Sequence, residues 1–240
     1  MPVFAIGDLH LPGHDEKPMD VFGHRWERHF ELVCENWTRL VAPDDVVLIP
    51  GDISWAMQMN DAMDDLRAIA ALPGKKVLLR GNHDYWWSSI SRLRGCLPEG
   101  MYALQNDALV LGDVAVCGTR GWMIPTSSGD GDKQDEKIYQ RELIRLRLSL
   151  QQARQLAGER PIVCMLHYPP VLSDLNPTGF TEALEAYRVH TVVYGHLHGA
   201  AIANGFCGPL RGIQYELVSC DALCCVPKRL TIEQANINFS

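Results

Sequence analysis

The chain alternates short, continuous apolar runs with longer segments in which apolar residues recur every three or four positions. The short runs predict buried strands, and the longer segments predict amphipathic helices. Strands are expected at residues 3–6, 46–49, 77–79, 102–104, 108–111, 114–118, 162–166 and 191–194, with two more in the tail at 214–219 and 229–232. Helices are expected at residues 24–41, 60–72 and 136–157. This order predicts an α/β (α+β) fold in which two sheets pack together with helices outside.

Local signals support several of these elements. Pro73-Gly74 ends the second helix, and Gly112-Asp113 joins two of the strands tightly. The third helix carries one apolar stripe, made by Tyr139, Leu143, Leu146, Leu150, Ala153 and Ala157. Because the sequence contains neither a repeat nor a linker, we expect a single domain over residues 1–240.

Composition and charge narrow the range of partners. The 240 residues carry a formal net charge of −7, with 22 Lys and Arg against 29 Asp and Glu. Because binding to a nucleic-acid polymer depends on basic residues that neutralise phosphates, this balance argues against such a partner. No apolar stretch approaches the length of a membrane-spanning helix and no signal peptide is evident, so we expect a cytoplasmic protein without a membrane partner. The oligomeric state stays open.

The eight cysteines are scattered, and four of them cluster late, at Cys207, Cys220, Cys224 and Cys225. A zinc site needs a repeated paired spacing that this cluster lacks. In a cytosolic chain cysteines stay reduced, and free cysteine behaves as a small hydrophobic residue. We therefore interpret these residues as buried free thiols.

Polar residues that can bind metals follow the ends of five predicted strands. They are Asp8 and His10 after residues 3–6, Asp52 after 46–49, Asn82, His83 and Asp84 after 77–79, His167 after 162–166, and His196 and His198 after 191–194. In open α/β sheets, ligands bind outside the carboxyl ends of the strands. If the strands are mostly parallel, all five endings converge on one cleft.

The spacing within these segments agrees with a shared site. On extended backbone, residues two apart point to the same side, so Asp8 with His10, and His196 with His198, can aim at a common point. The glycines before Asp8, Asp52, Asn82 and His196 let the chain turn sharply. Each motif alone has an ordinary explanation as a surface turn or a core histidine, but five of the nine histidines lie in these endings. We interpret the set as a metal site, and His14, His24, His29 and His190 as surface or packing residues.

The ordered set Asp-x-His, Gly-Asp, Gly-Asn-His-Asp, His and Gly-His-x-His, over positions 8–198, resembles the calcineurin-like metallophosphoesterase superfamily, in particular a group of bacterial phosphohydrolases. The resemblance implies a four-layer sandwich of two mixed sheets flanked by helices. It also implies two divalent ions bridged by Asp52. Asp8, His10 and His198 would complete the shell of one ion, and Asn82, His167 and His196 that of the other. Oxygen and imidazole donors without thiolate suit Mn²⁺, Fe or Zn²⁺.

Such a pair of ions activates a bridging hydroxide for in-line attack on phosphorus. His83 would be the general acid or donate a hydrogen bond to the phosphate, and Asp84 would fix its tautomer. The expected activity is hydrolysis of a small phosphomonoester or phosphodiester. Alternatives are a cyclic-nucleotide phosphodiesterase, a metal-dependent hydrolase of another ester, or an inactive binding platform.

Two motif variations bear on the substrate. The Asp-Arg-Gly pattern of Ser/Thr phosphatases is absent after Asp52, where the sequence reads Ile53-Ser54-Trp55. The segment His167-Tyr168-Pro169-Pro170 is similar to the His-His-Pro-Pro of cyclic-nucleotide phosphodiesterases, but Tyr168 replaces the second histidine. Both departures argue against these two narrower assignments.

Other residues in the same loops are candidates for contact with substrate. Trp55 and Trp86 would stack on a ring, with packing of the loops onto the domain as the alternative. Arg120 would grip phosphate, with a surface salt bridge as the alternative. The loops at residues 11–23 and 124–135 are expected to shape access, the second as a mobile lid rather than a calcium loop.

Overall fold

The computed structural model describes residues 1–13, 19–125 and 133–232. Within them, one sheet has the strand order β11-β1-β2-β3-β4. Its strands are β1 (Val3–Ala5), β2 (Val46–Pro50), β3 (Lys75–Leu79), β4 (Met101–Leu104) and β11 (Lys228–Arg229). The first four strands run parallel and β11 pairs antiparallel with β1, so this sheet is mixed.

The second sheet of the described chain has the order β5-β6-β7-β8-β10-β9. Its strands are β5 (Ala108–Leu111), β6 (Val114–Thr119), β7 (Ile162–Leu166), β8 (Thr191–Tyr194), β9 (Gly208–Leu210) and β10 (Ile213–Leu217). The four central strands are parallel, while β5 and β9 are antiparallel edges. The tight turn expected at Gly112-Asp113 is confirmed, because Leu111 pairs directly with Val114.

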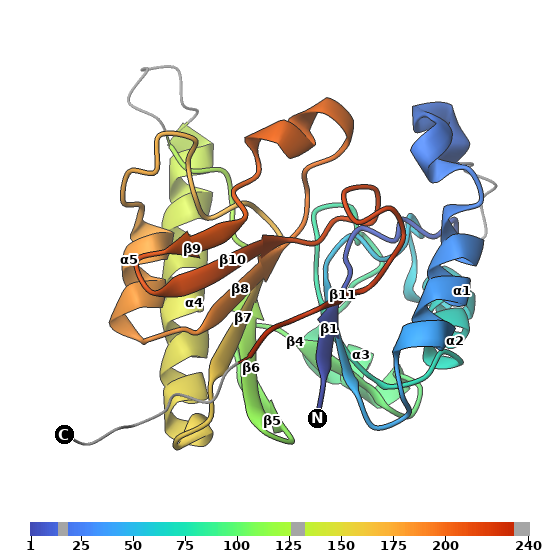
Figure 1. Cartoon of the computed structure of the whole chain (residues 1–240), viewed down its shortest axis with the longest axis horizontal. Helices are drawn as coiled ribbons and strands as arrows, with labels where there is room; N and C mark the ends of the chain where they lie inside the picture. Colours follow the sequence, from blue (N-terminus) through green and yellow to red (C-terminus); the bar gives the residue numbers. More distant parts are fainter. Residues whose placement is uncertain (14–18, 126–132, 233–240) are drawn as a thin grey trace.

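Helices cover the outer face of each sheet (Figure 1). The first sheet is covered by α1 (His29–Leu40), α2 (Met59–Ala70) and α3 (Ile90–Cys96), and the second by α4 (Lys133–Ala157) and α5 (Gly179–Ala186). The order helices, sheet, sheet, helices confirms the expected four-layer sandwich. No helix in the described part of the chain is both long enough and apolar enough to cross a bilayer.

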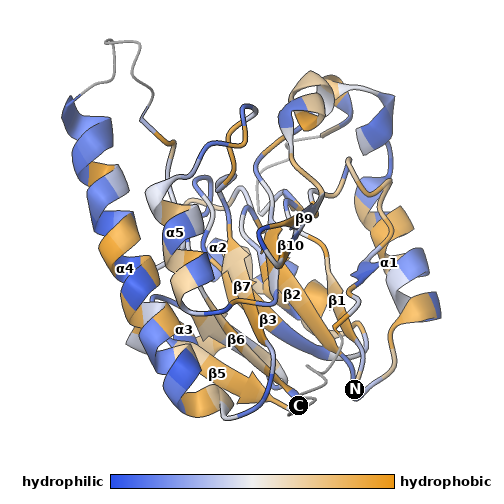
Figure 2. Ribbon diagram, turned by 60° about the vertical axis from the view of Figure 1, so that its left-hand side comes forward, coloured by the Kyte–Doolittle hydropathy of each residue, from blue (hydrophilic) through white to orange (hydrophobic). Residues whose placement is uncertain are grey.

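Alternation of side chains along the strands divides the core into three apolar layers. Figure 2 shows that the strands consist mostly of hydrophobic residues. In β1, Val3 and Ala5 point between the two sheets, while Phe4 points toward α1 and α2. The stripe expected on α4 is buried along its whole length against the second sheet. Since the central strands of both sheets carry mostly apolar side chains on both faces, the carboxyl ends of the parallel strands become the place where a polar site can form.

Some expectations about the elements were wrong. The helix expected at 24–41 is divided into a 3-10 turn at His24–Trp26 and α1, because Arg28 adopts a left-handed conformation with φ of 50°. The tail strand expected at 229–232 pairs only at Lys228–Arg229. The elements α3, α5 and β9 are too short to produce a clear period, and the 3-10 turns at Met19–Phe22 and Gly199–Asn204 were not expected either.

The cysteines are all free thiols in the described residues. Cys220 and Cys225 are buried as expected, whereas Cys207 and Cys224 are exposed because they lie in surface turns around β9 and β11. His14 and residues 126–132 of the second loop lie outside the described residues, so the expectation of a lid there is untested.

Candidate metal centre

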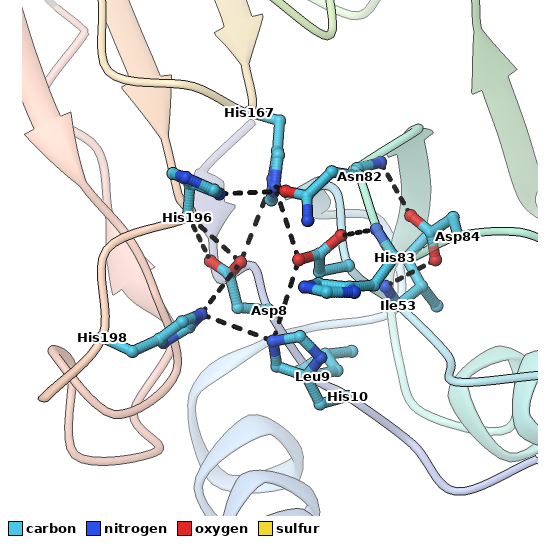
Figure 3. Close-up of polar contacts among 12 residues, drawn as sticks. Asp8, Leu9, His10, Ile53, Asn82, His83, Asp84, His167, His196 and His198 are labelled. Carbon is cyan, nitrogen blue, oxygen red and sulfur yellow. Dashed lines mark hydrogen bonds and ion pairs between the residues drawn. The ribbon is translucent and has the colours of Figure 1, made fainter. Parts of the chain in front are cut away.

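The loops that follow β1, β2 and β3 meet the loops that follow β7 and β8 at one edge of the sandwich. Figure 3 shows Asp8, His10, Asn82, His167, His196 and His198 pointing toward one another, with His83 beside them. Two groups of carboxylate and imidazole donors lie within metal-binding reach, namely Asp8 with His10 and His198, and Asp8 with Asp52 and His167. The expected convergence of five strand endings is therefore present.

The first group lies between the loops after β1 and β8. His10 Nε2 is 3.4 Å from His198 Nε2, and His198 Nε2 is 3.5 Å from Asp8 Oδ1. Asp8 is fully buried and His10 is 3% exposed. Three donor atoms that face a common point in this way match the ligand shell of a cation.

The second group extends from His167 to two further candidate ligands, Asn82 and His196, and Asn82 lies between the two histidines. The name second group includes them from here on. The Oδ1 atom of Asn82 lies 2.7 Å from His167 Nε2 and 2.9 Å from His196 Nδ1. Asp52 Oδ2 lies 3.4 Å from His167 Nε2 and 3.8 Å from His10 Nε2, so this carboxylate stands between the two groups. His167 is fully buried, and its Nδ1 is 3.0 Å from the carbonyl oxygen of Pro50. This bond orients the ring so that Nε2 faces the cluster.

The backbone at these residues differs from the expectation of an extended chain. Asp8, His10, Asp52 and His196 all have positive φ, of 55°, 46°, 49° and 74°. Side chains two apart still converge, but because left-handed turns redirect them and not because of strand alternation. Non-glycine residues in this region are strained and persist only where the surroundings hold them. Strain at four of the seven candidate ligands is consistent with a site selected for function.

Two glycines give the carboxylates their room. A Cβ atom at Gly81 would lie 2.1 Å from Asp52 Oδ1, and one at Gly195 would lie 2.2 Å from Asp8 Oδ2. Any other residue would displace the carboxylate. Gly81 and Gly195, which were expected to let the chain turn sharply, are thus needed chiefly for space around the two aspartates.

Electrostatics in the cluster favour positive charge between the carboxylates. Burial would lower the pKa of His167, but Asp52 and Asp8 raise it to about 9. Burial likewise opposes protonation of His198, whose hydrogen bonds to Asp221 and Asp8 raise its pKa to about 10. Burial lowers the pKa of His10 to about 4. The carboxylates of Asp8 and Asp52 thus favour positive charge beside them, in the place where divalent cations would fit.

Comparison with known proteins agrees with this geometry. The model of the calcineurin-like phosphoesterase family matches residues 1–200. The chain belongs to this family. No curated protein matches its sequence. Among solved structures, a protein of unknown function (AQ665) from Aquifex aeolicus is 16% identical with a TM-score of 0.51, the alignment covering 95% of each chain. Phosphopantetheinyl hydrolase (PptH) from Mycobacterium tuberculosis is also 16% identical, with a TM-score of 0.57, over 91% of this chain and 88% of that one. These likenesses show the same fold.

In this calcineurin-like phosphoesterase, one more residue supports the first group by orienting His198. Asp221 Oδ1 lies 2.9 Å from His198 Nδ1, and its Oδ2 accepts a hydrogen bond from Gly199 N at 2.9 Å. This contact holds the His198 ring with Nε2 toward Asp8. Sequence reasoning missed Asp221 because it follows the end of β10 by four positions, after Val218-Ser219-Cys220. Extending the search for polar strand endings to β10 would have found it.

His83 lies at the rim of the cluster. Its backbone N–H donates to Asp52 Oδ1 at 2.8 Å, and its ring lies 4.4 Å from the ring of Trp55, between centroids. The side chain is partly exposed. Backbone anchoring and an accessible ring are what a residue that contacts substrate requires.

Asp84 does not contact the His83 ring among the described residues, so the tautomer-fixing role expected for it is corrected. Its carboxylate accepts N–H groups from Gly81 at 2.7 Å, Ile53 at 2.8 Å, Ser54 at 3.2 Å and the Trp86 indole at 3.0 Å. Burial and the Asp52 charge raise the pKa of Asp84 to about 6, against these hydrogen bonds. Asp84 ties the loop after β2 to the loop after β3.

The side chains of the three residues expected to contact substrate lie in different surroundings. Trp86 is 2% exposed and faces the core, so loop packing, the alternative, is the correct interpretation for it. Trp55 stacks on His10, with 4.8 Å between ring centroids, and borders the cluster. The backbone carbonyl of Arg120 accepts from His167 N at 2.9 Å, and its guanidinium lies 4.6 Å from the centre of the Trp122 ring. No surface salt bridge of Arg120 is present among the described residues.

Proposed function

We propose that this chain is a dinuclear-metal phosphoesterase that hydrolyses small phosphomonoesters or phosphodiesters. The observation that carries the proposal is the convergence of seven oxygen and nitrogen donors from both sheets, with Asp52 within 4 Å of histidines from both groups. Because neither sheet alone supplies either group, we also infer that residues 1–240 work as one domain.

The donors divide between two ions in this proposal. Asp8, His10 and His198 would hold one ion, Asn82, His167 and His196 would hold the other, and Asp52 would be shared by both. The donor set suits Mn²⁺, Fe or Zn²⁺. Two such ions, when bound, lower the pKa of a water molecule and polarise the phosphoryl group. Two buried carboxylates offset only half the charge of two dications, so the loaded site attracts an anionic ester.

The chain's own residues contribute orientation and a proton. Asp84 and the backbone of the loop after β2 hold Asp52 and Asn82 in register. His83, anchored by its N–H to Asp52, presents its ring at the rim, where it donates a proton to the leaving oxygen. Trp55 lies against the His83 ring and fixes one side of the entrance.

Tyr168, which replaces the second histidine of the cyclic-nucleotide phosphodiesterase motif, does not support that alternative. The ring of Tyr168 packs on His196 with 4.2 Å between centroids and is 7% exposed. It stabilises the position of His196 and does not reach toward substrate. The inactive-platform alternative requires a lost ligand, and every candidate ligand lies in the cluster. The fold is compatible with varied esters, as the name of the Mycobacterium tuberculosis hydrolase illustrates.

The test is an assay of phosphomonoesters, phosphodiesters, cyclic nucleotides and phosphopantetheinyl esters with added Mn²⁺, Zn²⁺ or Fe²⁺. Asp52→Asn should lose bound metal, measured by elemental analysis, and its turnover should fall to background. His83→Ala should retain metal but lose about 10²–10⁴-fold in kcat on esters with poor leaving groups. The exposed His24→Ala is the matched control. Equal turnover in all four proteins would refute the proposal.

A further inference from the structure

A polar cavity lies at the same edge of the sandwich as the candidate metal centre. It has a volume of about 130 Å³ and is formed at the carboxyl ends of β3, β4 and β6 together with one face of α4. Its polar lining consists mainly of Arg80, Gln105, Asn106, Arg120, Glu142 and Arg145. Since a water molecule occupies about 30 Å³ in the liquid, this space accommodates a tetrahedral oxyanion.

The one carboxylate among the described residues that line the cavity is already fully engaged. Glu142 is 1% exposed, and its Oε2 accepts from Thr119 Oγ1 at 2.6 Å and from Gly121 N at 3.2 Å. Its Oε1 accepts from Arg145 Nη1 at 2.5 Å. Three guanidinium groups therefore face one carboxylate, which leaves this lining with an excess of two positive charges.

Within the described ranges, the other two arginines lack anionic partners. The Nε atom of Arg80 is buried and has no hydrogen-bond acceptor there. The Arg120 guanidinium rests on Trp122, and neither it nor that of Arg80 forms an ion pair in this part of the chain. Burial lowers the pKa of Arg120 most, Glu142 and Tyr168 raise it, and the charges of Arg80 and Arg145 lower it further. Arginines gathered in this way are costly unless an anion joins them.

The cavity adjoins the second group of candidate ligands. Arg80 precedes Asn82 by two residues, and the Arg120 carbonyl accepts the backbone N–H of His167. The backbone segments that place Asn82 and His167 therefore also place the guanidiniums of Arg80 and Arg120. This shared backbone is what relates the cavity to the candidate ligands.

We propose that Arg80, Arg120 and Arg145 form a subsite for a second phosphoryl group, so that the substrate is an ester carrying two phosphates, only one of which is cleaved. Arg80 and Arg120 supply the free N–H groups, and Arg145, held by Glu142, adds charge. Planar guanidinium groups suit phosphate oxygens because they can donate two parallel hydrogen bonds. This inference rests on the proposed phosphoesterase function.

A matched pair of substrates tests it. The value of kcat/KM is measured with adenosine 3′,5′-bisphosphate and with the two adenosine monophosphates, and the ratio of bisphosphate to the better monophosphate is compared between proteins. In Arg80→Gln and Arg120→Gln this ratio should fall about 10–100-fold, chiefly through KM, since a charged hydrogen bond contributes roughly 1.5–3 kcal/mol. Arg147→Gln is the control. It removes an exposed arginine of α4, the helix that carries Arg145, and should preserve the wild-type ratio.

A ratio that stays within about twofold of wild type in both variants would overturn the subsite. Wild-type protein that cleaves no phosphate ester would instead contradict the proposed function, and a second measurement then decides the subsite independently of activity. The thermal unfolding midpoint of the full chain, without added metal, is followed as sulfate is added. Sulfate should raise it for wild type and Arg147→Gln more than for Arg80→Gln and Arg120→Gln. Equal shifts would reject the subsite, and sulfate-specific shifts with an unchanged substrate ratio would indicate a free-anion site and also reject the proposal.

Discussion

The loops after β1 and β2 of the first sheet hold their candidate ligands by backbone geometry, whereas two of the three histidines after β7 and β8 of the second sheet are oriented by ring hydrogen bonds to groups outside the cluster. After β1 and β2, Asp8, His10 and Asp52 are all left-handed, and the two loops are joined by Asp8 N to Gly51 O at 2.9 Å and His10 N to Asp52 O at 3.0 Å. After β7 and β8, only His196 of the candidate ligands is left-handed. His167 and His198 are oriented by Pro50 and Asp221 instead.

The two sheets nevertheless depend on each other at the site. The partner of His167 is a carbonyl of the first sheet, and Asp8 of the first sheet accepts the backbone N–H of His196 at 3.1 Å. The apolar layer between the sheets, which includes Leu48 of β2 and Met165 of β7, sets their separation. The donors reach each other only after this layer has formed, so folding and metal binding should be strongly linked.

The largest expected effect comes from filling the space beside either aspartate. Gly81→Ala places a methyl group 2.1 Å from Asp52 Oδ1, and Gly195→Ala places one 2.2 Å from Asp8 Oδ2. Each should reduce kcat by at least about 100-fold and weaken metal binding, because an ångström of displacement at reacting groups has effects of this size. Turnover and metal titration by calorimetry provide the measurement.

Gly95→Ala is the matched control, since a Cβ there meets no atom within 4 Å. It should keep wild-type turnover. If Gly81→Ala is inactive while Gly195→Ala is unaffected, the second sheet does not constrain Asp8, and the mutual dependence of the sheets is incorrect.

A smaller effect is expected from the side-chain support of the second sheet. Asp221→Asn weakens the hydrogen bond that orients His198 and should lower metal affinity about 10–100-fold, the usual range for residues behind a ligand histidine. Competition of metal with a fluorescent chelator measures this affinity. Asp44→Asn, at an exposed aspartate, controls for the loss of one negative charge. Unchanged affinity in Asp221→Asn would mean that the His198 ring is held by other contacts.

The sequence alone predicted most of the fold and the candidate ligands, because both depend on one simple pattern. Apolar runs place the strands, and polar residues directly after them are brought to one edge by parallel pairing. The left-handed conformations were not predictable, since only a few per cent of non-glycine residues adopt them, although Asp and His do so more often than most. Those conformations arise from hydrogen bonds between the loops after β1 and β2, which are tertiary contacts.

The residues missed or misplaced share a physical reason. Asp221 follows β10 and Arg80 follows β3, but neither belongs to a recognisable motif, and the contact of Asp221 with His198 depends on packing. Trp86 adjoins the Gly-Asn-His-Asp motif, yet its indole turns inward to donate to Asp84. The position of Trp86 beside the motif correctly indicated that it lies in the same loop. The direction of its side chain was decided by burial of its apolar surface.

Outside the candidate centre, Lys76 in the first half and Glu142 in the second are both buried charged side chains, and they are satisfied differently. Lys76 of β3 is 2% exposed, and its Nζ donates to the carbonyls of Ala70, at 3.0 Å, and Leu72 at the carboxyl end of α2. Glu142 of α4 in the second half is held by Thr119, Gly121 and Arg145. The first therefore has only neutral partners among these contacts, and the second has a charged one. Burial should thus be more costly for the charge of Lys76.

Lys76→Met tests this difference and should have the smallest effect. Burial lowers the pKa of Lys76 to about 8 from its ordinary value of 10.5. Between these values the unfolded chain holds a proton that the folded chain has released, so the free energy of unfolding of wild type should rise with pH across the window, by at most about 3 kcal/mol. Urea unfolding at pH 7.5, 9 and 10.5 measures it. The rise should be absent from Lys76→Met and retained in Lys75→Met, whose lysine is partly exposed. Parallel pH profiles for wild type and Lys76→Met would show that the carbonyls at the end of α2 fully compensate the buried charge.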